Sequence, residues 1–107
     1  MSTQLETMQY ILEYLHPRSV FTARRMFGEY ALYANGKVVG FVCDDTLYVK
    51  ITPESTQQLD DTCEQRAPYI GAKLHYIVDE SGLQAVSGIS RLLVGMARAM
   101  SKKNLNL

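Results

Sequence analysis

The side chains best suited to catalysis are those of two cysteines and two histidines, and their spacing does not indicate a reactive centre. Cys43 and His75 would act as a nucleophile and its base only if the two side chains were in hydrogen-bond contact and the thiol were activated. The alternating pattern of residues 37–43 instead places Cys43 on the apolar face of a strand, where a thiol packs as an unreactive side chain. We therefore expect no catalytic residue.

Two pairs of neighbouring acids, Asp44-Asp45 and Asp60-Asp61, have the side chains needed to bind a cation or to exchange protons. The first pair lies at a predicted strand reversal, where aspartate favours the turn conformation. The second pair lies on the polar face of a predicted helix, where acids are normally solvated. No glycine-rich stretch precedes a predicted helix in the way that phosphate-binding loops require. We expect neither a metal site nor a bound cofactor.

The tyrosines form a second group with functional potential, since the sequence has seven of them and no tryptophan. Four lie on predicted strands: Tyr30, Tyr33, Tyr48 and Tyr76. A sheet that carries tyrosines beside Arg24 and Arg25 would resemble the surfaces on which single-stranded nucleic acids stack. The commoner arrangement of strand tyrosines is a half-buried ring with a solvated hydroxyl.

Positive and negative charges balance over the whole chain but are unevenly distributed. The C-terminal segment from residue 84 has four bases and no acid: Arg91, Arg98, Lys102 and Lys103. Such a gradient either steers a charged partner or follows the helix dipoles. These four bases, with Arg24 and Arg25, are the candidate partner contacts. A neutral chain lacks the usual driving force for DNA binding, so we expect no strong duplex DNA binding by this chain alone.

Residues 24–51 predict three consecutive antiparallel strands around which the chain is organised. Asn35-Gly36 favours a type I′ turn and sets Tyr33 opposite Val38. Unbroken alternation then places one set of side chains on a buried face: Met26, Tyr30, Leu32, Val39, Phe41 and Cys43. A three-residue loop over residues 44–46 extends that face, because it adds the side chains of Leu47, Val49 and Ile51.

Three helices and a fourth strand are predicted around these strands. Thr3 and Glu6 have the form of a capping box, so the first helix is expected to begin near Gln4. Its apolar stripe is Leu5, Met8, Ile11, Leu12 and Leu15. Thr52 and Pro53 predict the start of a second helix, which runs to about residue 66. Residues 73–78 alternate as a strand that buries Leu74, Tyr76 and Val78.

The last helix is predicted from Ser81 onward, with Gly88 dividing it into a short turn and a main helix. The main helix has an apolar face of Ile89, Leu92, Leu93, Met96, Ala97 and Met100. The predicted fold is therefore a single α+β domain over residues 1–107, a two-layer antiparallel sheet covered by helices in the order α-β-β-β-α-β-α. No apolar run is long enough to span a bilayer and the N-terminus lacks the basic leader of a signal peptide. We expect a cytoplasmic protein that makes no membrane contact.

Four short motifs taken together resemble the N-terminal domain of the TfoX/Sxy competence regulators. They are RRMFGEY at residues 24–30, NGK at 35–37, DTLYVK at 45–50 and YIVDES at 76–81, and the resemblance covers essentially the whole chain. It implies a two-layer α+β fold related to secretion-chaperone-like domains, without catalytic residues. It also implies a part in regulating DNA-uptake genes, where such proteins assist the cyclic-AMP receptor protein at promoters. Full regulators continue into a C-terminal helix-hairpin-helix domain, so this sequence is either a stand-alone relative or a piece of a full regulator.

Two hypotheses of different classes follow. The favoured one is a non-enzymatic interaction module of a regulator of competence gene transcription, which acts through protein partners in the transcription machinery. The alternative is a stand-alone domain that binds a small ligand or nucleic acid through its tyrosine-bearing sheet. Both hypotheses are compatible with a homodimer.

Overall fold

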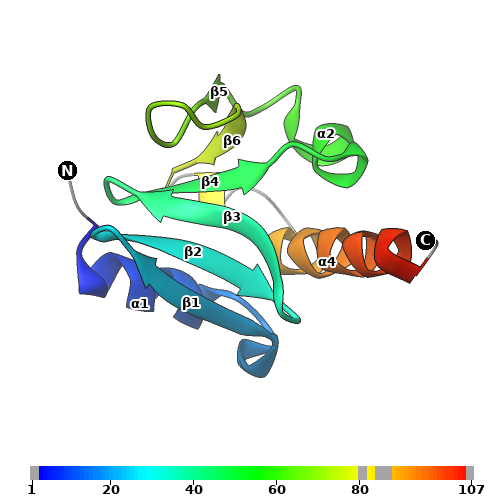
Figure 1. Cartoon of the computed structure of the whole chain (residues 1–107), viewed down its shortest axis with the longest axis horizontal. Helices are drawn as coiled ribbons and strands as arrows, with labels where there is room; N and C mark the ends of the chain where they lie inside the picture. The colour runs from blue at the N-terminus through cyan, green and yellow to red at the C-terminus, as the bar shows by residue number, and fades with distance from the viewer. Residues whose placement is uncertain (1–2, 80–81, 84–87, 106–107) are drawn as a thin grey trace.

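The computed structural model describes residues 3–79, 82–83 and 88–105 of the chain (Figure 1). The elements are α1 (Leu5–Tyr14), the 3₁₀ helix η1 (Arg18–Val20), β1 (Phe21–Met26), β2 (Glu29–Ala34), β3 (Lys37–Cys43), β4 (Thr46–Lys50), α2 (Pro53–Leu59), β5 (Gln65–Arg66), β6 (His75–Val78) and α4 (Ile89–Leu105). The strands form one antiparallel sheet in the order β1-β2-β3-β4-β6-β5. The predicted α+β class, with an antiparallel sheet covered by helices, is confirmed.

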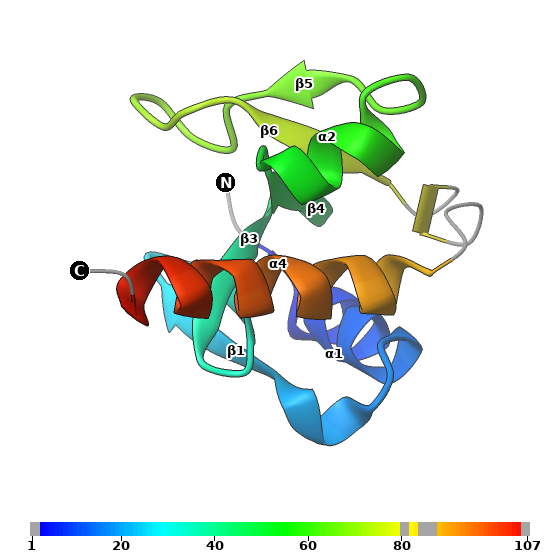
Figure 2. The same cartoon turned by 90° about the vertical axis from the view of Figure 1, so that its right-hand side faces the viewer.

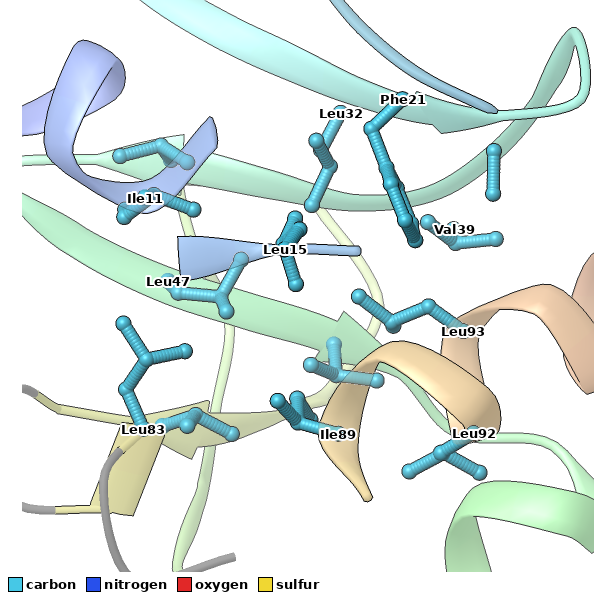
Figure 3. Packing of buried hydrophobic residues seen from close by; sticks show 14 of the residues in the cluster. Ile11, Leu15, Phe21, Leu32, Val39, Leu47, Leu83, Ile89, Leu92 and Leu93 are labelled. Carbon is cyan, nitrogen blue, oxygen red and sulfur yellow. The ribbon is translucent and has the colours of Figure 1, made fainter. Parts of the chain in front are cut away.

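Helices α1, α2 and α4 cover the same face of the sheet, and α4 lies between α1 and α2 (Figure 2). The core lies between the sheet and this layer (Figure 3). Its largest fully buried side chains include Phe21 of β1, Leu32 of β2 and Leu93 of α4. We call the opposite side of the sheet the outer face. Among the described residues, no helix is both long and apolar enough to cross a bilayer.

The first predicted strand is in fact two strands joined by a tight turn. Phe27 and Gly28 both have positive φ angles, 51° and 83°, and this conformation reverses the chain between β1 and β2. Met26 consequently pairs with Glu29 and belongs to the outer face, so its predicted place on the buried face is wrong. Residues 21–23, which precede the predicted strands, are the first half of β1.

The predicted register between β2 and β3 is correct at Tyr33 and Val38 but fails one residue further on. A β-bulge leaves Val39 without a cross-strand partner, so that Leu32 pairs with Gly40 instead. Because of this extra residue, each later side chain of β3 lies on the opposite face of the sheet from the predicted one. Val39 and Val42 are buried under the helices, whereas Phe41 and Cys43 lie on the outer face, against the prediction.

The reversal between β3 and β4 uses two residues, not the predicted three. Asp44 and Asp45 have φ angles of 52° and 60°, and Cys43 pairs directly with Thr46. Leu47 and Val49 still reach the core, because the bulge in β3 has already shifted the register by one residue. Ile51 follows the end of β4 and is exposed, so its predicted burial is wrong.

The start of α1 is capped by a distant residue and not by the predicted capping box. Gln4 is the N-cap residue and makes no side-chain cap of its own. The Asp45 carboxylate accepts hydrogen bonds from the Gln4 backbone N–H and the Thr7 hydroxyl, both at 2.9 Å. Leu5 is exposed, but the rest of the predicted stripe is buried. A carboxylate from the β3–β4 turn thus stabilises the positive end of α1.

The other predicted elements are present with altered ends. Thr52 caps α2 as expected, with Ser55 in place of the usual glutamate, but the helix ends at Leu59 and leaves room for β5. Strand β6 buries Tyr76 and Val78, while Leu74 precedes it and is exposed. The expected start of the last helix at Ser81 lies outside the described residues. The main helix, α4, begins at Ile89 and continues to Leu105.

Candidate interaction surface

Cys43 and His75 both lie on the outer face, and the structure shows neither an activated thiol nor a nucleophile–base contact between them. Burial, with the nearby carboxylates of Glu29 and Asp44, raises the pKa of Cys43 from 9.0 to about 11. This shift keeps the thiol protonated and weakly nucleophilic. No group of three or more metal-ligating side chains occurs in the described part of the chain.

His75 is buried and held in its neutral form. Its Nδ1 lies 2.9 Å from the Lys73 carbonyl oxygen, which can only accept, so Nδ1 carries the proton. Its Nε2 is buried without a hydrogen-bond partner among the described residues. Burial lowers the pKa of His75 below 6.5, and the positive charge of Lys50 acts in the same direction. The ring packs edge-on against Phe41, with the centroids 5.5 Å apart.

The four strand tyrosines do not share one face, so the structure does not form the predicted stacking platform. Tyr30 and Tyr76 point into the helix-covered core. The Tyr76 hydroxyl donates to Asp60 of the α2 C-cap at 2.8 Å. Tyr33 and Tyr48 pair with outer-face residues, and Tyr48 is only 4% exposed.

The six predicted contact bases fall into two separate groups. Arg24 and Arg25 are exposed on edge strand β1, where their guanidinium carbons lie 5.6 Å from the Tyr33 ring and 6.0 Å from the Tyr30 ring. Such cation–π geometry orders an arginine without removing it from water. Arg91, Arg98 and Lys102 are exposed along α4 in the helical layer, and the side chain of Lys103 lies outside the described part. The sheet separates Arg24 from the α4 group, so the bases do not form one patch.

A cleft of about 590 Å³ opens on the outer face between the β1–β2 turn and residues 66–70, and we call it the outer cleft. Phe41 and Tyr48, paired across β3 and β4, form its apolar floor. Phe27 lines it from the β1–β2 turn, and Ile70 lines it from the β5–β6 loop. Figure 1 shows that this loop, the β1–β2 turn and the β3–β4 turn lie at the same end of the sheet.

The β5–β6 loop is folded over the outer face by local contacts. Pro68 lies two residues after the end of β5, and the Ala72 N–H donates to the Tyr69 carbonyl at 3.1 Å, which closes a turn. The Tyr69 ring packs edge-on against Phe41, with the centroids 6.0 Å apart. This aromatic contact holds one wall of the outer cleft over its floor.

The polar groups of the outer cleft are few and unequal in charge. Glu29 and Asp44 supply two carboxylates, and Arg66 supplies a guanidinium. Glu29 is held in place, because its Oε1 accepts from the Thr3 hydroxyl at 2.6 Å and from the Asp44 backbone N–H at 3.0 Å. Glu29 directly follows the β1–β2 turn and Asp44 is in the β3–β4 turn, whereas Arg66 lies on the far edge strand β5. The cleft therefore has an acidic end.

The sequence prediction missed the outer cleft, although two signals for it were present. A glycine inside a strand pattern, here Gly40, indicates a bulge, and that bulge places Phe41 on the outer face. A Cβ at Gly40 would lie 2.2 Å from the Tyr48 carbonyl oxygen, so only glycine fits there. The Phe27-Gly28 dipeptide also has the X-Gly form of a two-residue turn.

The fold and this surface describe an α+β domain with one sheet face closed by helices and the other bearing a cleft without a reactive group. The chain belongs to the TfoX N-terminal domain family, whose sequence profile matches residues 13–95. That segment runs from the end of α1 into α4 and includes all four motifs on which the predicted resemblance rests. The family is a non-catalytic domain family, and its members are related to competence regulators.

A curated relative supports this assignment. The chain is 36% identical over 80 residues to an uncharacterized 12.7 kDa protein in the trpE 5′ region of Spirochaeta aurantia, across 75% of this chain and 69% of the relative. Comparison with solved structures finds no match.

Proposed function

We propose that this chain is a non-enzymatic interaction module of a TfoX/Sxy-like regulator of competence gene transcription, acting in the cytoplasm through a protein partner. Family membership supports the regulatory role. The interaction role rests on the exposure of Phe27 and Ile70, at 99% and 103% of their reference areas, beside the apolar floor of the outer cleft. Contiguous exposed apolar surface of this kind is characteristic of protein interaction sites.

The partner belongs to the transcription machinery, and the cyclic-AMP receptor protein is the first to test. The bases of α4 are available to such a partner because Arg91, Arg98 and Lys102 are exposed. Two groups of bases on different sides of the domain suit a protein partner with dispersed acids better than a continuous phosphate backbone. Any effect on a promoter would then arise through the partner.

A second candidate function is the binding of a small ligand in the outer cleft. Its volume of about 590 Å³ lies within the usual range for small-molecule sites. The division of the strand tyrosines between two faces removes the support for stacking of single-stranded nucleic acid on the sheet.

The experiment uses the tagged chain as bait in a lysate of its source bacterium. We expect RNA polymerase subunits or the cyclic-AMP receptor protein among the captured proteins. Capture should decrease in an Arg91→Gln/Arg98→Gln variant. The matched control is Lys37→Gln/Lys73→Gln, which removes two bases from outside α4.

Failure to capture any transcription protein, together with a rise in melting temperature on adding a small-molecule extract, would contradict the proposal and favour the ligand-binding alternative. Equal capture by the two double variants would show that the α4 bases make no contact with the partner.

A further inference from the structure

Phe27 occupies a position that neither burial nor turn geometry explains. It is the first residue of a two-residue turn with φ 51°, where asparagine, aspartate and glycine are the usual residues. A left-handed conformation is unfavourable for a bulky side chain. Phe27 is 99% exposed, so no packing against the described residues compensates for that cost.

Ile70 shows the same exposure on the opposite wall of the outer cleft. The two walls come from segments far apart in the sequence, and both contribute a large apolar side chain that projects beyond the floor of Phe41 and Tyr48. A small molecule within the cleft would leave both projecting side chains in water. A polypeptide that crosses the cleft would cover them, and this observation favours a protein segment over a small ligand.

Charge further restricts the occupant. The carboxylates of Glu29 and Asp44 lie at the end of the cleft next to the β1–β2 and β3–β4 turns, and their negative field reaches the Cys43 thiol. Glu29 is already held by Thr3 and by the Asp44 backbone, so it needs no reordering to receive a cation. Arg66 is the one base of the lining, which makes the cleft unsuitable for a phosphate backbone.

We propose that the outer cleft binds a segment of a partner protein that inserts an apolar side chain between Phe27 and Ile70 and places a neighbouring lysine or arginine against Glu29 and Asp44. This inference rests on the proposed function in requiring a protein partner. It adds the site and the chemistry of the segment that the site recognises.

The test is selection of a displayed random peptide library on the immobilised 107-residue chain, followed by fluorescence anisotropy with the enriched peptides. We expect enrichment of peptides with an aromatic or large aliphatic residue close to a lysine or arginine. Phe27→Asn and Ile70→Ser should each weaken binding at least about tenfold, the usual effect of losing an interface anchor. Asp44→Asn should weaken binding and reduce its dependence on salt.

The variants are chosen to preserve folding. Asparagine suits the left-handed turn positions of Phe27 and Asp44, so thermal melts of these variants should match or exceed the parent. The matched controls are Leu5→Ser, which removes an exposed apolar side chain from α1, and Asp61→Asn, which removes an exposed acid that does not line the cleft. Both controls should bind the peptides as the parent does.

Three results of the peptide and sedimentation experiments would overturn the proposal. The first is no enrichment, or enrichment of peptides that lack the apolar and basic pair. The second is unchanged affinity in Phe27→Asn and Ile70→Ser. The third is self-association of the parent in sedimentation velocity that Phe27→Asn abolishes, because the occupant would then be a second copy of the chain. If the parent and Phe27→Asn captured transcription proteins equally, the proposed function would stand, but the outer cleft would not be the site that binds the partner.

Discussion

The Thr3 hydroxyl lies 2.6 Å from Oε1 of Glu29 and joins the segment before α1 to the start of β2. The same hydroxyl oxygen is 3.1 Å from the Val42 carbonyl and accepts from the Asp45 N–H at 3.2 Å. One side chain therefore connects the N-terminal segment with the β1–β2 and β3–β4 turns at the acidic end of the outer cleft.

Replacing Thr3 with valine should lower the free energy of unfolding by about 1–3 kcal/mol, the cost of leaving buried polar partners unsatisfied. Thr3 is only 5% exposed, so water cannot fully replace the lost hydroxyl. Urea unfolding measures the change. Thr22→Val on the exposed outer face of β1 is the control, and equal losses in the two variants would disprove the role of Thr3.

Phe21→Ala and Phe41→Ala should differ in cost because the two rings lie on opposite faces of the sheet. Phe21 is fully buried in the core, and its truncation should cost about 3–5 kcal/mol. Phe41 is partly exposed and contacts Tyr69 and His75, so its truncation should cost less than about 2 kcal/mol. Urea melts of both variants check the order, and a larger loss for Phe41→Ala would place that ring in the core.

Cys43 should react with a thiol reagent much more slowly than Cys63 in the folded protein near neutral pH. A pKa of about 11 in place of 9.0 lowers the thiolate fraction roughly a hundredfold, and the side chain is buried as well. Cys63 is only partly buried. Mass spectrometry after timed labelling resolves the two sites, and denaturant should make their rates equal. Rapid labelling of Cys43 in the native state would contradict the assignment.

His75 should make the fold less stable in mild acid. Its pKa is lowered in the folded state, so the unfolded chain binds more protons at and below about pH 6.5, and the free energy of unfolding falls as the pH decreases through this range. The His75→Phe variant should show a smaller fall between about pH 7 and pH 5 in urea melts. An NMR titration of the parent provides the second measurement, and a normal or raised pKa for His75 would refute the mechanism.

Duplex DNA should bind this chain no more tightly than about 10 μM at physiological salt. Four phosphate contacts by Arg91, Arg98, Lys102 and Lys103 would give a salt slope of only about −3.6, on a chain whose net charge is zero. Titration of labelled duplex into the purified chain measures the affinity. Sub-micromolar binding that weakens in Lys102→Ala would instead identify a nucleic-acid-binding domain.

The parts of the fold that the sequence predicted correctly are those set by local chemistry. The Asn35-Gly36 turn, the Thr52 cap and the apolar stripe of α4 each depend on residues a few positions apart. The errors lie where distant residues decide the structure. Asp45 caps α1 from 41 residues away, and no pattern near Gln4 could indicate that contact.

The outer cleft could not be predicted for the same reason. Its walls come from a turn near Phe27 and a loop near Ile70, which meet only after the sheet has formed. Arg24, Arg25, Arg91, Arg98 and Lys102 are exposed, but the sheet that separates Arg24 from the bases of α4 is a property of the fold. Exposure of a phenylalanine can be recognised only once its neighbours have been placed.

The unpaired Val39 determines which side of the sheet has an aromatic floor. If Val39 were instead paired with Leu32, so that the two strands had no bulge, simple alternation would turn Phe41 and Cys43 beneath the helices and bring Val42 to the outer face. The change would exchange the inside and the outside of half a strand without altering its composition. A relative with a β3 of the same length but without the bulge would therefore keep the sheet while losing the floor of the cleft, so the bulge distinguishes chains that can hold a partner segment there from chains that cannot.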